Sequence, residues 1–113
     1  MKADLVVIGG GPAGMGAALE AHRLGVKEIL IIERDLSLGG ILQQCIHNGF
    51  GLHLFGDELT GGEYAQRFID QLVASGIHVL TDTMVMEVEP GLVRAVNKGG
   101  VLGIQAGAII LAM

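Results

Sequence analysis

The chain has 113 residues, half of them apolar, and a formal net charge of −5. This length accommodates one domain at most, and the apolar content excludes a disordered chain. The seven basic residues are scattered, which argues against nucleic acid or an anionic membrane as a partner, and the single cysteine excludes an internal disulfide.

The first predicted elements are a short strand, a glycine turn and a helix. Residues 5–8 read Leu-Val-Val-Ile, a run typical of a buried strand. The run leads into a Gly-x-Gly-x-x-Gly turn at Gly9, Gly11 and Gly14, and a helical pattern extends from about residue 12 to residue 24. Strand, glycine turn and helix in this order are typical of dinucleotide-binding folds.

Each residue of this glycine turn has a predicted physical role. Gly9 lets the chain turn tightly off the strand, Gly11 lets the backbone approach a pyrophosphate, and Gly14 lets the helix pack close to the strand. Pro12 suits the first turn of a helix, where its missing N–H costs nothing. The helix start at Pro12 and Ala13 offers free N–H groups and the positive end of the helix dipole to phosphates.

A second strand predicted over residues 28–32 ends in an acid. Glu33 stands nineteen positions after Gly14, where a carboxylate can accept hydrogen bonds from the hydroxyls of an adenosine ribose. It would repel a 2′-phosphate, so we expect NADP not to occupy this site. Arg34 and Asp35 follow, either as residues that flank the adenine or as solvated loop charges.

Residues 34–59 lack clean periodicity, and so long an irregular stretch in a compact domain is usually a functional loop. The stretch contains the doublet Gly39-Gly40 and a single cysteine, Cys45, followed by His47. Histidine and cysteine neighbours here lack the number and spacing of zinc ligands, so we predict no metal site.

The second half of the chain begins with a helix introduced by a capping box, Thr60-x-x-Glu63, and ended by Ser75-Gly76. Its predicted buried face follows helical spacing and comprises Ala65, Phe68, Ile69, Leu72 and Val73.

A strand over residues 77–80 comes next. Three alternating segments at 83–89, 92–97 and 101–105 then predict an antiparallel meander. Met84 and Met86 are expected on its inner face.

A last strand, at residues 108–111, is predicted to be buried on both faces. The chain stops at Met113, directly after this strand. Because termini normally lie in exposed segments, we expect this chain to be the N-terminal piece of a longer protein.

Together these elements predict an α/β, Rossmann-like fold for FAD or NAD(P), with a parallel sheet flanked by helices and a three-stranded antiparallel meander. The whole chain resembles the N-terminal FAD-binding region of the pyridine nucleotide–disulfide oxidoreductase superfamily. The order of glycine turn, Glu33, the Gly39-Gly40 doublet, second helix, meander and final strand carries the resemblance. The loop from Gly39 to Gly51 is similar to a narrower group associated with glycerol-3-phosphate or amino-acid (opine, sarcosine) oxidation.

The resemblance implies that the ADP part of FAD lies over the glycine turn and Glu33. The flavin then extends past Gly39 and Gly40 toward the loop at residues 43–47. A second dinucleotide domain, for NAD(P)H, is implied outside this chain. The sequence departs from the disulfide reductases, which carry two cysteines after the doublet. Of the Ala-Thr-Gly motif expected after the last strand, Ala112 matches, Met113 stands in place of Thr, and the glycine is missing.

Two loop residues are candidates for chemistry beside the flavin. Cys45 is either a thiolate redox partner or a small buried hydrophobe. His47 is either a proton donor or anion contact, or a loop histidine satisfied by backbone groups. The Gly39-Gly40 doublet itself either brings N–H groups against the flavin or is a plain turn.

We therefore expect an FAD-dependent oxidoreductase that passes hydride between NAD(P)H and a small-molecule substrate or acceptor. An NAD-binding dehydrogenase domain without flavin, or a non-catalytic flavoprotein-like subunit, are the alternatives. No run reaches the ~18 apolar residues of a membrane span and no signal peptide is recognised, which predicts a cytoplasmic protein. Homo-oligomer and partner subunit both stay open, and the 113-residue chain alone is expected to hold flavin weakly and to be inactive.

Overall fold

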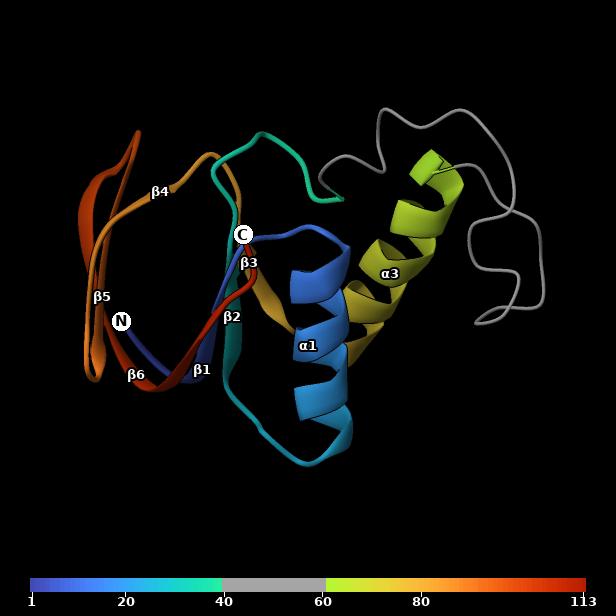
Figure 1. Ribbon diagram of the computed structural model, residues 1–113, viewed down its shortest axis with the longest axis horizontal. Coiled ribbons are helices and arrows are strands. Elements are labelled where there is room, and N and C mark those ends of the chain that lie inside the picture. The colour runs from blue at the N-terminus through green and yellow to red at the C-terminus, as the bar shows by residue number, and fades with distance from the viewer. Residues whose placement is uncertain (40–60) are drawn as a thin grey trace.

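A computed structural model describes the fold over residues 1–39 and 61–113, with the helix and strand order shown in Figure 1. The described part is a mixed α/β structure, which confirms the predicted fold class. Its elements are β1 (Lys2–Ile8), α1 (Pro12–Arg23), β2 (Ile29–Ile32), α3 (Gly61–Ser75), β3 (His78–Leu80), β4 (Met84–Glu89), β5 (Leu92–Asn97) and β6 (Gly100–Leu111).

The described strands form one six-stranded sheet in the order β3-β2-β1-β6-β5-β4. Strands β3, β2, β1 and the C-terminal part of β6 run parallel to one another. Val6 of β1 lies opposite Leu30 of β2 on one side and Ile109 of β6 on the other. The pairs β4–β5 and β5–β6 are antiparallel, which confirms the predicted meander. Parallel strands place their carboxyl ends at one edge of the sheet, where α/β folds bind ligands.

The prediction of two separate strands at residues 101–105 and 108–111 was wrong, because both segments belong to the single continuous strand β6. Gln105 is the point at which the strand changes partners, since it pairs with both Leu92 and Lys2. A Cβ added to Gly107 would lie 2.7 Å from the backbone oxygen of Asp4. The missing side chain therefore lets β1 approach closely where β6 crosses from the meander to the parallel strands.

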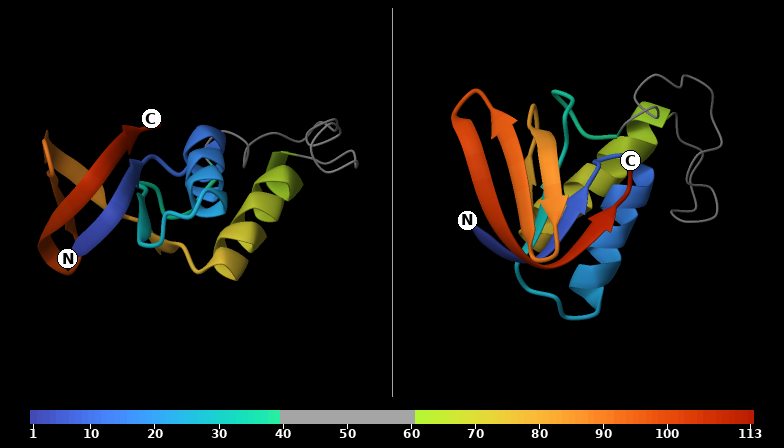
Figure 2. Two further views of the ribbon diagram at one scale, coloured as in Figure 1. Left: turned by 90° about the horizontal axis from the view of Figure 1, so that it is seen from below. Right: turned by 60° about the vertical axis from the view of Figure 1, so that its left-hand side comes forward.

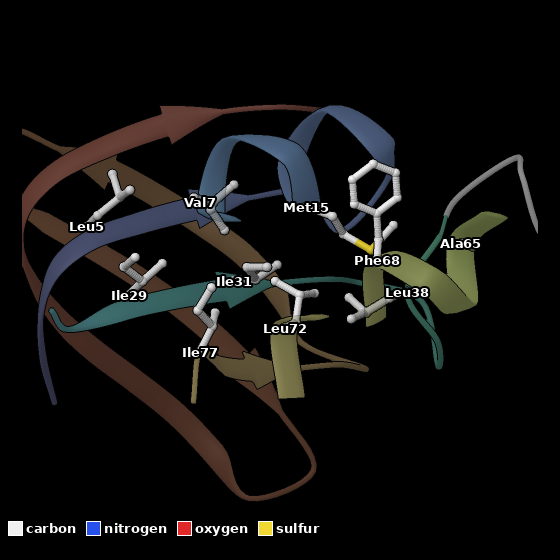
Figure 3. Close-up of a cluster of buried hydrophobic side chains, with 11 residues drawn as sticks. Leu5, Val7, Met15, Ile29, Ile31, Leu38, Ala65, Phe68, Leu72 and Ile77 are labelled. Carbon is white, nitrogen blue, oxygen red and sulfur yellow. The ribbon is translucent and has the colours of Figure 1, made fainter. Parts of the chain in front are cut away.

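Helices α1 and α3 lie together on one face of the parallel strands, as Figures 1 and 2 show. Alternate residues of β1 and β2 point their side chains at these helices, and Met15 of α1 and Phe68 of α3 belong to the same buried cluster (Figure 3). The predicted buried face of α3 is correct at Leu72 and wrong at Val73, which is 76% exposed. Consecutive residues on a helix point about 100° apart, so neighbours at the edge of an apolar stripe differ sharply in burial.

The opposite face of the parallel strands is covered by the meander, where Val93 and Ile104 pack with Val6 and Ile8. The prediction that Met84 and Met86 lie on the inner face of the meander was wrong. Both are exposed, at 56% and 64%, and Val85 packs inward instead. The register shifts between Val85 and Glu87, and an irregularity of this kind disturbs simple alternation along a strand.

The last residues of β6 are not buried on both faces, contrary to prediction. Ile110 is 37% and Leu111 62% exposed. The reason is position, because α1 packs over β1 and β2, whereas β6 lies on the far side of β1. The apolar composition of this segment therefore predicted correctly that it is a strand of the sheet, but it did not predict that the described helices leave its last residues exposed.

Candidate dinucleotide-binding site

A cavity of about 500 Å³ opens at the carboxyl ends of β1 and β2. Its wall includes Gly9 and Gly11 of the glycine turn, Glu33 after β2, and Thr83 before β4. Ala112, just beyond β6, completes the same edge, and Figure 1 shows the C-terminus beside the turn into α1. The cavity therefore lies where the parallel strands end, the usual ligand position in open α/β sheets.

Packing within the chain explains two of the three motif glycines. Gly9 has φ +115°, and a Cβ there would lie 2.6 Å from the backbone oxygen of Ala112. A Cβ at Gly14 would lie 1.8 Å from the backbone oxygen of Gly9 and 3.4 Å from Val7. Gly9 thus permits the turn and the approach of the strand that follows, and Gly14 permits α1 to lie against the end of β1.

Gly11 is not explained by packing. It is the N-cap of α1 with φ −78° and ψ −172°, an extended conformation open to any residue, and a Cβ there meets nothing within 4 Å. Its lack of a side chain leaves the helix start uncapped, and no acid lies in the first turn. The first N–H groups of a helix have no intrahelical acceptor, so those after Pro12, at Ala13 and Gly14, are open to an external anion.

Glu33 faces the glycine turn and is buried, with 7% of its surface exposed. One carboxylate oxygen, Oε1, accepts a 2.8 Å hydrogen bond from the Gly10 N–H, and Oε2 accepts a 2.7 Å bond from the Asp35 N–H. A carboxylate has about four lone-pair directions, so two backbone donors leave acceptor capacity for a sugar hydroxyl.

The segment that follows β3 fixes the loop that carries Glu33. The Glu33 N–H donates to the oxygen of Leu80, and its carbonyl accepts from the N–H of Thr83 at 3.0 Å. The N–H of Asp82 donates to the oxygen of Asp35 at 2.7 Å. These backbone bonds hold the acid and the start of β4 as one unit around the cavity.

Thr83 is a site residue that sequence reasoning missed. Its side chain is 1% exposed, donates to the oxygen of Thr81 at 2.9 Å and accepts from the side-chain amide of Asn97 at 3.3 Å. The available signal was the polar run at residues 81–83 between two strands. A buried hydroxyl needs such partners, and here they connect the meander to the cavity wall.

Gly10 was also missed, because it occupies a variable position of the motif. Its carbonyl accepts a 2.8 Å bond from the N–H of Gly39, the first glycine of the predicted doublet. Gly39 has φ +106°, which explains a glycine there by backbone conformation. The doublet position is thereby connected to the glycine turn.

The remaining predicted residues divide into two groups. Arg34 and Asp35 are exposed and line the cavity beside Glu33. Gly40, Cys45 and His47 lie outside the described residues. Within residues 1–39 and 61–113, no group of three or more His, Cys, Asp or Glu side chains is placed to hold a metal ion. Among the described helices, none has the length and apolar character that crossing a membrane requires.

The fold and the cavity define a Rossmann-type dinucleotide-binding chain, and the comparisons with known proteins agree. The sequence profile of the family described as FAD dependent oxidoreductase matches residues 4–101, and the chain belongs to this family. The narrower glycerol-3-phosphate and amino-acid group does not emerge from the comparisons.

Curated relatives are similar over different lengths. Dihydrolipoyl dehydrogenase of Pseudomonas aeruginosa is 30% identical over 98% of this chain and 25% of its own length. Thioredoxin reductase of Ureaplasma parvum is 32% identical over 68% of this chain and 24% of its own. The chain thus spans about a quarter of the length of each of these relatives.

Solved structures with a similar fold match nearly the full length of the chain. L-proline dehydrogenase from P. horikoshii matches with a TM-score of 0.81 and 26% identity, over 100% of this chain and 22% of that protein. Thioredoxin reductase from Streptococcus pyogenes matches with a TM-score of 0.75 and 24% identity, over 97% of this chain and 34% of that protein.

Proposed function

We propose that this chain supplies the ADP-binding part of an FAD site in an oxidoreductase that passes hydride between NAD(P)H and a small-molecule substrate or acceptor. Family membership supports the flavin, and the glycine turn supports the binding role. Gly11 carries the proposal, because neither its backbone conformation nor its surroundings require a glycine. A close approach of a phosphate to the backbone would explain why a residue without a side chain stands at this position.

The residues around the cavity fit such a cofactor. The backbone N–H groups of Gly11, Ala13 and Gly14 would hold the pyrophosphate, and Pro12 would preset the first helical turn. Glu33 has acceptor capacity left for the ribose hydroxyls after its two backbone bonds. When bound, FAD supplies the hydride chemistry, and the protein positions and insulates it.

The rest of the proposal rests on the resemblance and not on the described residues. We place NAD(P)H in a second dinucleotide domain, and we keep Cys45 and His47 as candidate groups beside the flavin. The loop from Gly39 to Gly51 supports the glycerol-3-phosphate and amino-acid oxidation group. Scattered basic residues and a negative net charge support a protein that binds neither nucleic acid nor anionic membranes, and we keep the cytoplasm as its proposed location.

The test replaces Gly11 by alanine and compares it with Gly16→Ala in the same helix. A Cβ at either position meets nothing within 4 Å, so both variants are expected to fold. Titration of the full chain with ADP and with FAD should show affinity reduced about tenfold or more in Gly11→Ala, because a methyl group displaces a phosphate and its charge-assisted hydrogen bonds. Gly16→Ala should bind as the wild type does.

Equal affinities in the two variants would argue against phosphate binding at the glycine turn. An NAD-binding dehydrogenase without flavin would also bind ADP in this cavity, so ADP alone does not separate it from the proposal. The same titrations are therefore repeated with NAD and compared with those with FAD. A yellow full-length protein that is bleached by NADH supports the flavoprotein. A colourless one that takes up NAD and not FAD supports the dehydrogenase.

A further inference from the structure

Gly10 is held by contacts on several sides, although it is not a motif residue. Its N–H donates to Oε1 of Glu33 at 2.8 Å, and its carbonyl accepts from Gly39 at 2.8 Å. A Cβ at this position would lie 2.4 Å from the end of the Leu38 side chain and 3.1 Å from the Glu33 side chain. The backbone at Gly10 is therefore pressed against the loop that follows β2.

These two hydrogen bonds fix both peptide planes that flank Gly10. A trans peptide is planar, with its C=O and N–H pointing in opposite directions. The bond from Gly10 to Glu33 orients the peptide between Gly9 and Gly10. The bond from Gly39 to the Gly10 carbonyl orients the next peptide, whose N–H belongs to Gly11.

The Glu33 carboxylate is fixed from its own side as well. It is buried, its second oxygen accepts from the Asp35 N–H, and its backbone bonds to Leu80 and Thr83. A buried carboxylate needs such donors to offset the loss of water. The acid is thus a rigid anchor, and the glycine turn is attached to it through Gly10.

We propose that Glu33 is a positioning residue for the phosphate-binding amides, acting through the Gly10 N–H, besides any contact it makes with a ribose. The inference rests on the proposed function, since it concerns the same ADP cavity. An anchored turn holds its N–H groups in the binding orientation before the ligand arrives, and binding then spends less free energy on ordering them.

The direction in which a substitution of Glu33 changes phosphate affinity separates this positioning role from a simple effect of charge. Glu33 is an anion beside a cavity that is proposed to bind anions, so removing its charge should tighten phosphate binding if charge alone mattered. Loss of the anchor should weaken it. Glu33→Leu removes the charge and both acceptor oxygens, including the one that accepts from the Gly10 N–H, whereas Asp35→Asn removes a neighbouring charge at the same cavity and leaves the Gly10 bond in place.

The experiment titrates the full chain with ADP and with 2′,3′-dideoxy-ADP, which has phosphates but no ribose hydroxyls. We expect Glu33→Leu to weaken dideoxy-ADP binding about tenfold, the scale of one charge-assisted hydrogen bond. Asp35→Asn should leave it unchanged or tighten it. In the NMR spectrum of the ligand-free chain, the Gly10 amide resonance should move in Glu33→Leu and stay in place in Asp35→Asn.

Weakened ADP binding with unchanged or tighter dideoxy-ADP binding in Glu33→Leu would overturn the inference and leave the proposed function intact. A wild-type chain that binds neither nucleotide would overturn both. If Glu33→Leu does not fold, Gly10→Ala tests the same link from the other side, because its methyl group must push away Leu38 and Glu33. That variant should also lose about tenfold in dideoxy-ADP affinity, and wild-type affinity would refute the anchor.

Discussion

Replacing Gly14 by alanine should destabilise the protein, although alanine is the better helix former. The added Cβ would lie 1.8 Å from the backbone oxygen of Gly9, which sits at the end of β1. Non-bonded atoms need more than about 3 Å, so the start of α1 must move away from the strand by more than about 1 Å. The obstacle is backbone and not the end of a flexible side chain, so it does not yield easily.

The magnitude follows from two opposing terms. Alanine in place of glycine stabilises a helix interior by about 1 kcal/mol. Overpacking against a rigid neighbour costs typically 1–3 kcal/mol, and a backbone obstacle favours the upper end, about 3 kcal/mol. The free energy of unfolding should therefore fall by about 2 kcal/mol, out of a total of about 5–15 kcal/mol for a domain.

Gly16→Ala is the matched control two residues further along α1. A Cβ there meets nothing within 4 Å, so only the helix term remains and stability should rise by about 0.5–1 kcal/mol. Urea unfolding followed by circular dichroism measures both variants, with a midpoint about 1 M lower for Gly14→Ala at an ordinary m value. Gly14→Ala as stable as Gly16→Ala would refute the close contact between helix and strand.

Two further predictions concern a buried hydroxyl and a surface ion pair. Thr83→Val keeps the shape of the side chain but leaves the Asn97 amide without its Thr83 acceptor, so it should lower the free energy of unfolding by about 1–3 kcal/mol. Thr83→Ser keeps the hydroxyl and should stay closer to wild type in thermal unfolding. The hydrogen bond from Arg23 lowers the pKa of Glu20, so the small stabilisation from this pair should be complete above the ordinary pKa of Glu and lost as pH falls through the folded-state pKa. NMR titration of Glu20 should show the lowered pKa, and Arg23→Met should return it toward its usual value; an unchanged titration in that variant would contradict the assigned cause.

The order of elements could be read from the sequence because each signal is local. The run at residues 5–8, Pro12 at the helix start and the apolar β2 each fix the conformation of their own few residues. Glu33 could be placed beside the glycine turn because parallel strands that are joined by one helix end at the same edge of the sheet. The Rossmann-type class therefore followed from neighbouring residues alone.

Tertiary contacts decided the rest, because they join residues that no local pattern relates. Gly10 and Glu33 are 23 positions apart, and their hydrogen bond exists only after β1 and β2 have paired. Whether a glycine is needed for packing, as at Gly14, or left open, as at Gly11, depends on which backbone lies opposite it. The burial of Ile110 likewise depends on which strands the helices cover, and the amino-acid sequence around Ile110 does not indicate which elements pack against it.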